Sequence, residues 1–128
     1  MRNLVHFIVG ILMTAGVTVV VSKPTMAQDP MKLSPKIYRL LLENDRVRVL
    51  EYHSKPGDKE PMHSHPPNLL YVLSASKLKF ALPDGQSREA QFRIGEVLWR
   101  EAETHTVENI GATDSRILII ELKQAPKK

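Results

Sequence analysis

Apolar residues come in short runs along most of this chain, and turn-forming residues separate the runs. The runs are rich in Val, Ile, Leu and Tyr, and none keeps the period of an amphipathic helix over about twelve residues. This pattern predicts eight short β-strands and an all-β fold, either a sandwich or a small barrel. The expected strands are 38–42, 47–53, 69–73, 77–82, 88–92, 96–100, 104–108 and 116–122.

The first 27 residues follow a different pattern from the rest of the chain. A mostly apolar run covers 4–21, and 25–27 offer small residues at the two positions that a signal peptidase reads. This predicts a secretory signal peptide cleaved before Gln28, and therefore a periplasmic or secreted protein. An uncleaved membrane anchor is the alternative, because the apolar run is close to the length that spans a bilayer. Pro24 argues against it, since it breaks the run just before the small residues.

A chain of 128 residues has room for one domain. We expect an extended N-terminal arm at 28–37, because Pro30 and Pro35 stand there among polar residues. The folded domain is expected at 38–123, and a short basic tail at 124–128.

Charge and cysteine content exclude several function classes. The whole chain has 18 Lys and Arg against 14 Asp and Glu, but Arg2 and Lys23 belong to the expected leader, which leaves 16 against 14. This even balance, without a basic cluster, excludes nucleic acid as an expected partner, and no membrane partner is expected after cleavage. The absence of cysteine excludes disulfides, thiol catalysis and Cys-bound metal. A metal site would therefore use His, Asp or Glu.

Four histidines follow the expected leader, and three of them suit a metal site. His63 and His65 flank one residue, so in an extended strand both rings point to the same side about 7 Å apart. His105 lies in another expected strand, whereas His53 is expected at the solvated end of its strand. Imidazole binds divalent Zn, Mn, Fe and Ni, and three imidazoles leave a position open for water or substrate.

Two segments carry a resemblance to a known family. Residues 57–65 read G-x5-H-x-H, as in the first cupin motif, while Gly95 stands where the second begins and 105–109 close it as H-x3-N. The chain thus resembles a small single-domain cupin. The resemblance implies a β-barrel of the double-stranded β-helix type with its histidines in the mouth. It also implies a choice among oxygenases, isomerases, decarboxylases and sugar-binding proteins, and pairing through edge strands as a homodimer.

The chain also departs from the cupin pattern. Leu69 and Leu70 stand where the first motif normally has a Glu ligand, and Glu101 and Glu103 replace a Pro and a Gly of the second. Three interpretations follow. The three histidines bind a metal with water completing the shell, or the site also recruits Glu103, which is two residues from His105, or the histidines bind a ligand without any metal.

Further candidates line the expected ligand pocket. Arg100, if it points inward, would bind the carboxylate of an acidic small molecule, whereas Trp99 and Tyr71 would pack against it or hydrogen-bond to it. The function hypothesis is an exported cupin with one divalent metal, acting as an oxygenase or isomerase on a small molecule. The alternative is a non-catalytic module that binds a small ligand or a metal for sensing or transport.

Overall fold

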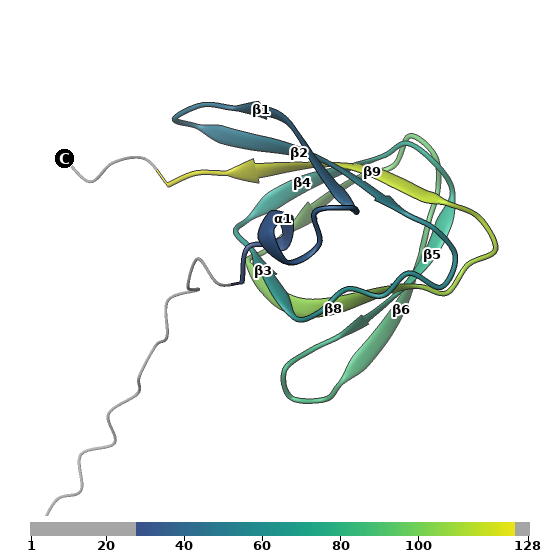
Figure 1. The fold of residues 1–128 in the computed structure, drawn as a ribbon. Coiled ribbons are helices and arrows are strands. Elements are labelled where there is room, and N and C mark those ends of the chain that lie inside the picture. Colours follow the sequence, from purple (N-terminus) through teal and green to yellow (C-terminus); the bar gives the residue numbers. More distant parts are fainter. Residues whose placement is uncertain (1–27, 125–128) are drawn as a thin grey trace, which may run out of the picture.

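The computed structural model describes residues 28–124, which form two antiparallel sheets closed into a barrel (Figure 1). One sheet has the strand order β1-β2-β9-β4-β7 and the other has the order β3-β8-β5-β6. The elements are α1 (Pro30–Leu33), β1 (Tyr38–Glu43), β2 (Val47–Ser54), β3 (His63–His65), β4 (Asn68–Val72), β5 (Ser76–Ala81), β6 (Ser87–Phe92), β7 (Val97–Arg100), β8 (Glu103–Asn109) and β9 (Ser115–Leu122). The expected leader at 1–27 and residues 125–128 of the expected tail lie outside the described residues.

All eight predicted strands are present, and no strand end differs from its predicted position by more than one residue. Alternation explains this agreement, because inward positions of the strands supply the barrel core. In β2, β9 and β4 the inward apolar residues are Leu50, Tyr52, Ile117, Ile119, Leu70 and Val72, and across the barrel they meet Leu78, Phe80, Phe92 and Val107. No helix within 28–124 has the length and apolar character needed to span a membrane.

The segment 28–37 is not uniformly extended as expected, because it contains the one-turn helix α1. Pro30 occupies the start of this helix, where proline is well tolerated, and the Asp29 side chain caps it by accepting a hydrogen bond from the Met31 N–H at 3.1 Å. The sequence pattern predicts no separate strand at β3, which has three residues between prolines. Its pairing with β8 makes it a strand.

Gly57 and Asn109, which belong to the two motif-like segments, fix the position of the loop before β3. Gly57 has φ +86°, a conformation that glycine adopts without strain, and its N–H donates to the Asn109 carbonyl at 2.8 Å. The buried Asn109 amide donates to the carbonyls of Ser54 and Thr113 at 3.2 and 3.0 Å. These bonds join the loop before β3 to the end of β8, so they fix the two histidine-bearing strands relative to each other.

Candidate metal centre

The three candidate histidines lie on two paired strands. His63 and His65 alternate on β3, and His63 is the direct antiparallel partner of His105 on β8. Residues two apart in a strand point to the same side, and directly paired residues share a side as well. Strand geometry therefore directs all three rings into the barrel.

These rings meet inside the protein. One ring nitrogen from each of His63, His65 and His105 lies within 4.8 Å of the other two. His63 is completely buried, and His65 and His105 are each 7% exposed. Among residues 28–124 this is the one cluster of His, Asp and Glu side chains that could hold a metal ion, and it contains no carboxylate. The sequence prediction of three histidines at one site thus corresponds to a close cluster.

The Nδ1 atom of each ring already has a partner outside the cluster of three histidines. His63 Nδ1 donates to the Pro61 carbonyl at 2.8 Å, and His65 Nδ1 contacts Glu121 Oε1 at 2.7 Å. His105 Nδ1 contacts Glu103 Oε2 at 3.2 Å. Acceptors at Nδ1 fix the tautomer that leaves Nε2 unprotonated, which is how metal-binding histidines are commonly oriented. Nε2 is therefore the nitrogen that each ring has left for a metal ion.

Burial also keeps the His63 and His105 rings neutral. Desolvation, aided by the neighbouring His65, lowers the pKa of His63 to about 4. Desolvation and the two other histidines lower the pKa of His105 to about 3, although Glu103 acts in the opposite direction. Neutral imidazole is the form that binds a metal. At neutral pH the cluster is ready to bind without first losing protons from these two rings.

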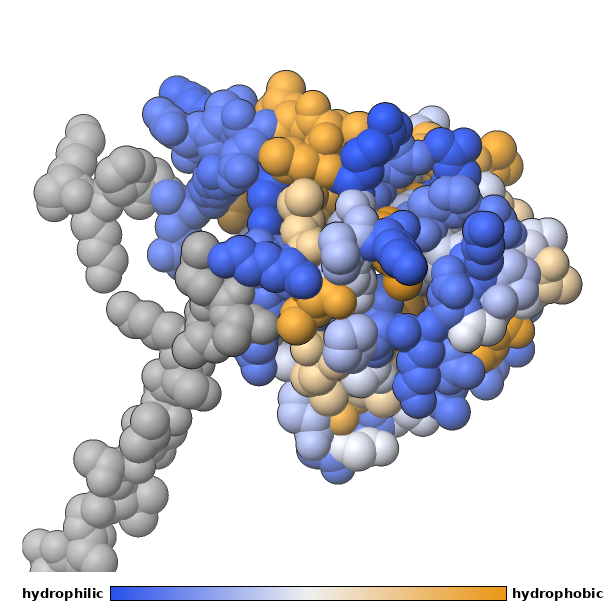
Figure 2. Space-filling view, viewed as in Figure 1, coloured by the Kyte–Doolittle hydropathy of each residue, from blue (hydrophilic) through white to orange (hydrophobic). Residues whose placement is uncertain are grey.

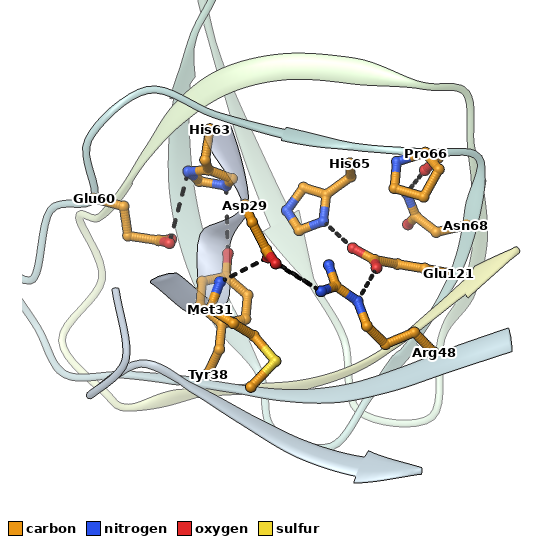
Figure 3. A network of polar contacts seen from close by, with 10 residues as sticks. All are labelled: Asp29, Met31, Tyr38, Arg48, Glu60, His63, His65, Pro66, Asn68 and Glu121. Atoms are coloured by element: carbon orange, nitrogen blue, oxygen red, sulfur yellow. Dashed lines mark hydrogen bonds and ion pairs between the residues drawn. The ribbon is translucent and has the colours of Figure 1, made fainter. Parts of the chain in front are cut away.

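A chain of charged groups supports His65 from behind (Figure 3). Glu121 on β9 contacts His65 with one carboxylate oxygen and accepts from Arg48 Nε with the other at 2.6 Å. Arg48 NH1 in turn donates to both carboxylate oxygens of Asp29, at 3.1 and 3.0 Å. Burial works to raise the pKa of Glu121, but the hydrogen bonds from His65 and Arg48 outweigh it and lower that pKa. Glu121 is therefore an ionised acceptor for the His65 ring.

Two further buried groups adjoin His63 in Figure 3. The Tyr38 hydroxyl lies 3.4 Å from His63 Nε2, and desolvation raises the pKa of this hydroxyl well above its usual value. Glu60 Oε1 lies 3.8 Å from His63 Nδ1, yet neither carboxyl oxygen of Glu60 accepts a hydrogen bond from a described residue. Burial raises the pKa of Glu60 to about 8. Both groups are therefore protonated and neutral beside the cluster at pH 7.

Glu103 lies beside the cluster but is engaged elsewhere. Its two carboxylate oxygens accept from Arg88 at 2.6 and 2.8 Å, and one of them also contacts Arg100 at 3.3 Å. The hydrogen bonds from Arg88 lower the pKa of Glu103 to about 2. It reaches His105 at Nδ1, at 3.2 Å. This geometry makes Glu103 an orienting group for His105.

Strand alternation separates the three other predicted pocket residues. Arg100 pairs with the buried Asn68 and lines the cavity next to the cluster. Trp99 and Tyr71 occupy the alternate positions and instead face outward, with 50% and 43% of each residue exposed. Trp99 Nε1 donates to Glu101 at 2.7 Å. The structure thus brings Arg100 to the cavity and leaves Trp99 and Tyr71 on the surface.

The sequence analysis missed Arg48, Glu121, Tyr38 and Glu60. A signal for the first two existed, because Glu121 has the same strand parity as the core residues Ile117 and Ile119, and Arg48 is its direct partner. Charged residues at inward positions need a reason, and here the reason is His65. For Tyr38 and Glu60 only the closed barrel shows the contact.

Several solved structures of cupin proteins have a fold similar to that of this chain. The chain resembles a cupin domain from Bordetella pertussis Tohama I, with 28% sequence identity over 69% of this chain and 93% of that chain, at a TM-score of 0.64. It also resembles an RmlC-like cupin family protein with a double-stranded β-helix fold from Methanocaldococcus jannaschii, with 12% identity, 67% and 78% coverage and a TM-score of 0.54. A cupin superfamily protein from Desulfitobacterium hafniense DCB-2 is similar at 17% identity, 68% and 76% coverage and a TM-score of 0.52.

No family model matches the chain, and no curated protein matches it in sequence. The similar solved structures nevertheless identify the type of fold. The all-β prediction is confirmed, and the barrel is of the cupin double-stranded β-helix type.

Proposed function

We propose that this protein binds one divalent metal ion through the Nε2 atoms of His63, His65 and His105, and uses it to transform a small molecule. The observation that carries the proposal is that all three Nδ1 atoms have partners outside the cluster, while one nitrogen of each ring lies within 4.8 Å of the other two. Buried histidines kept only for packing have no need for three such matched orientations. The donor set suits Zn, Mn, Fe or Ni.

The residues around the cluster fit such an ion. Three neutral imidazoles leave coordination positions open, and an ion held in this way acts as a Lewis acid toward a bound substrate oxygen. Glu103 and Glu121 hold the rings of His105 and His65 in place. Tyr38 carries a protonated hydroxyl at the cluster, and the apolar cavity wall limits the access of water. An oxygenase or isomerase reaction on a small molecule is the class that this arrangement favours.

Metal analysis of untagged protein tests the proposal. We expect about one equivalent of a transition metal in the wild type, and loss of that metal in His63→Ala and His105→Ala. His53→Ala is the matched control, because the His53 side chain is exposed and, among residues 28–124, pairs only with Asp114 at 2.8 Å. Less than about a tenth of an equivalent after loading with Fe, Mn, Ni and Zn in turn would contradict the proposal.

A non-catalytic binding module is the second candidate, and one observation favours it. The carboxylates nearest the cavity are engaged: Glu103 by Arg88, Glu101 by Trp99 and Glu121 by Arg48. No free general base is therefore evident among the described carboxylates at the cavity. Oxygen uptake, tested with each metal against thiols, diketones and phenols, separates the two candidates. Turnover with one metal and one substrate class supports the enzyme, whereas thermal stabilisation without turnover supports the module.

Export and self-association belong to the same proposal. The composition of 1–27 supports a cleaved leader, and N-terminal sequencing of membrane-free protein should find Gln28 first. Exposed leucines on the edge strand β1 support a homodimer: Leu40, Leu41 and Leu42 are 43–48% exposed, and Figure 2 shows apolar side chains at the surface along the top of the molecule. Light scattering should give twice the mass of the processed chain.

A further inference from the structure

The cavity beside the histidine cluster is lined mostly by apolar side chains. Its inner wall is apolar, and the residues that form it include Leu70, Leu78, Phe80, Phe92, Val107 and Ile119. His65, His105 and Tyr38 also line it. A molecule inside would therefore have hydrocarbon neighbours along its body, and polar neighbours at the cluster and where Asn68, Arg100, Glu101 and Glu103 line the cavity.

The cavity is also small. Its volume is about 50 Å³, and at about 10–15 Å³ for each water this is room for roughly three to five water molecules. A ligand of a few non-hydrogen atoms fits without rearrangement of the core. Sugars and long acyl chains exceed this space.

Most polar groups near the cavity are already paired. The Asn68 amide donates to the Pro66 carbonyl at 2.8 Å, and Arg100 contacts Glu103 and lies over the Phe80 ring, with 5.6 Å from Cζ to the ring centroid. The Tyr38 hydroxyl differs, because its partner is His63 Nε2. A metal ion bound to that nitrogen would take the place of the contact with Tyr38. The Tyr38 hydroxyl would then be available to donate a hydrogen bond to a ligand.

We propose, on the basis of the metal centre inferred above, that the cavity takes a short-chain monocarboxylate whose head group accepts a hydrogen bond from Tyr38. Three neutral imidazoles leave the charge of a divalent ion uncompensated, so an anionic oxygen ligand is favoured at the open positions. One donor beside the ion satisfies one carboxylate, whereas a second carboxylate or several hydroxyls would be left unpaired against the apolar wall. The short hydrocarbon tail contacts that wall.

Titration of Co(II)-loaded protein tests the ligand class. We expect the visible Co(II) spectrum to change on addition of propionate or butyrate, with much weaker changes for succinate and none for glucose. Octanoate should also bind poorly, because its chain exceeds the cavity. This series uses the wild-type chain, so it does not depend on the folding of any variant.

Two phenol-to-phenyl variants test the role of Tyr38. Tyr38→Phe should weaken butyrate binding about tenfold, as expected for the loss of a hydrogen bond to a charged group, while Co(II) is retained. Tyr52→Phe is the matched control, because Tyr52 also lines the cavity and packs on Tyr38 with 5.5 Å between ring centroids. Within residues 28–124 the Tyr52 hydroxyl makes no hydrogen bond to the three histidines. Its butyrate affinity should stay within about twofold of wild type.

The outcomes separate this inference from the metal centre. Failure to retain Co(II) would overturn both. Retention of Co(II) with a spectrum insensitive to butyrate, or with succinate or glucose bound as tightly, would overturn the ligand class and leave the metal centre standing. Equal weakening in Tyr38→Phe and Tyr52→Phe would overturn the role of the Tyr38 hydroxyl.

Discussion

Two buried glutamates adjoin the histidine cluster, and their environments have opposite effects. Glu60 and Glu121 are each 2% exposed, so they lose nearly the same contact with water. Glu121 has His65 and Arg48 as close partners, and its pKa is lowered. The Glu60 carboxyl has no well-formed hydrogen bond among the described residues, and desolvation outweighs its contacts with Tyr38 and Ser34 and raises its pKa to about 8. Partners, more than burial, decide which carboxyl is ionised.

The same difference decides which glutamate orients a histidine. Glu121 reaches His65 Nδ1 at 2.7 Å and fixes that ring. Glu60 stays 3.8 Å from His63 Nδ1, which donates instead to the Pro61 carbonyl. The Pro61 carbonyl, which directly follows Glu60 in the chain, is a neutral acceptor that orients the His63 ring. Glu121 is thus part of the metal centre, and Glu60 is a neutral neighbour.

Removal of Glu121, the ionised glutamate, should have the largest effect on stability and metal binding. Glu121→Ala leaves Arg48 with only Asp29 and leaves His65 Nδ1 without an acceptor. We expect a loss of about 3–5 kcal/mol in the free energy of unfolding and about 10–100-fold weaker metal binding. Urea unfolding and competition with a chelator measure these two quantities.

Glu43→Ala is the matched control for that variant. Glu43 pairs with Lys123 at 2.9 Å on the surface, with the side chains 43% and 38% exposed. Its removal should change stability by less than about 1 kcal/mol and leave metal affinity unchanged. Wild-type metal affinity in Glu121→Ala would contradict the orienting role of Glu121.

Glu60, the neutral glutamate, should make the free energy of unfolding depend on pH. Between its ordinary pKa of 4.5 and the raised value of about 8, Glu60 holds a proton in the folded protein and is ionised in the unfolded chain. The folded state binds more protons there, so Glu60 lowers stability as pH rises, by up to about 1.4 kcal/mol for each pH unit.

Glu60→Gln removes this dependence. The stability of the variant relative to wild type should therefore increase steadily from pH 5 to pH 7, as measured by urea unfolding at each pH. Glu43→Gln, an exposed glutamate, serves as the control and should show no such trend. A constant difference between Glu60→Gln and wild type would mean that Glu60 is ionised in the folded protein.

The smallest effect should come from the far end of the chain of charges. Asp29→Ala removes the cap of α1 and one partner of Arg48, and we expect about 1 kcal/mol lower stability with metal binding weakened severalfold. Asp29→Asn keeps a capping side chain without the charge. If Asn restores stability but not metal affinity, the charge on Asp29 supports His65 through Arg48. If both recover together, Asp29 acts only as a cap.

Strand prediction succeeded here because inward and outward residues alternate clearly. The run at β9 places Ile117 and Ile119 inward, and the same parity places Glu121 beside them. The three histidines followed from their spacing and from the motif resemblance. The same parity also separates Arg100 from Trp99, but only the pairing of β7 with β4 tells which of the two faces the cavity.

Other parts of the site depend on contacts that sequence does not encode locally. Tyr38 meets His63 across 25 positions, and only closure of the barrel brings them together. β3 lacked a strand signal because it has three residues flanked by Pro61, Pro66 and Pro67. A strand that short depends on its partner β8 for its existence.

β3 is also the last strand of its sheet, so two of the three candidate ligands sit on an edge. Open edges invite pairing with strands of other molecules, and prolines and covering helices prevent this. Here prolines flank the strand, and α1 packs against it (Figure 1). The Ser64 hydroxyl also donates to Gln28 at 3.0 Å. A chain shortened past residue 34 would lose that cover, and its first defect would be intermolecular aggregation through β3.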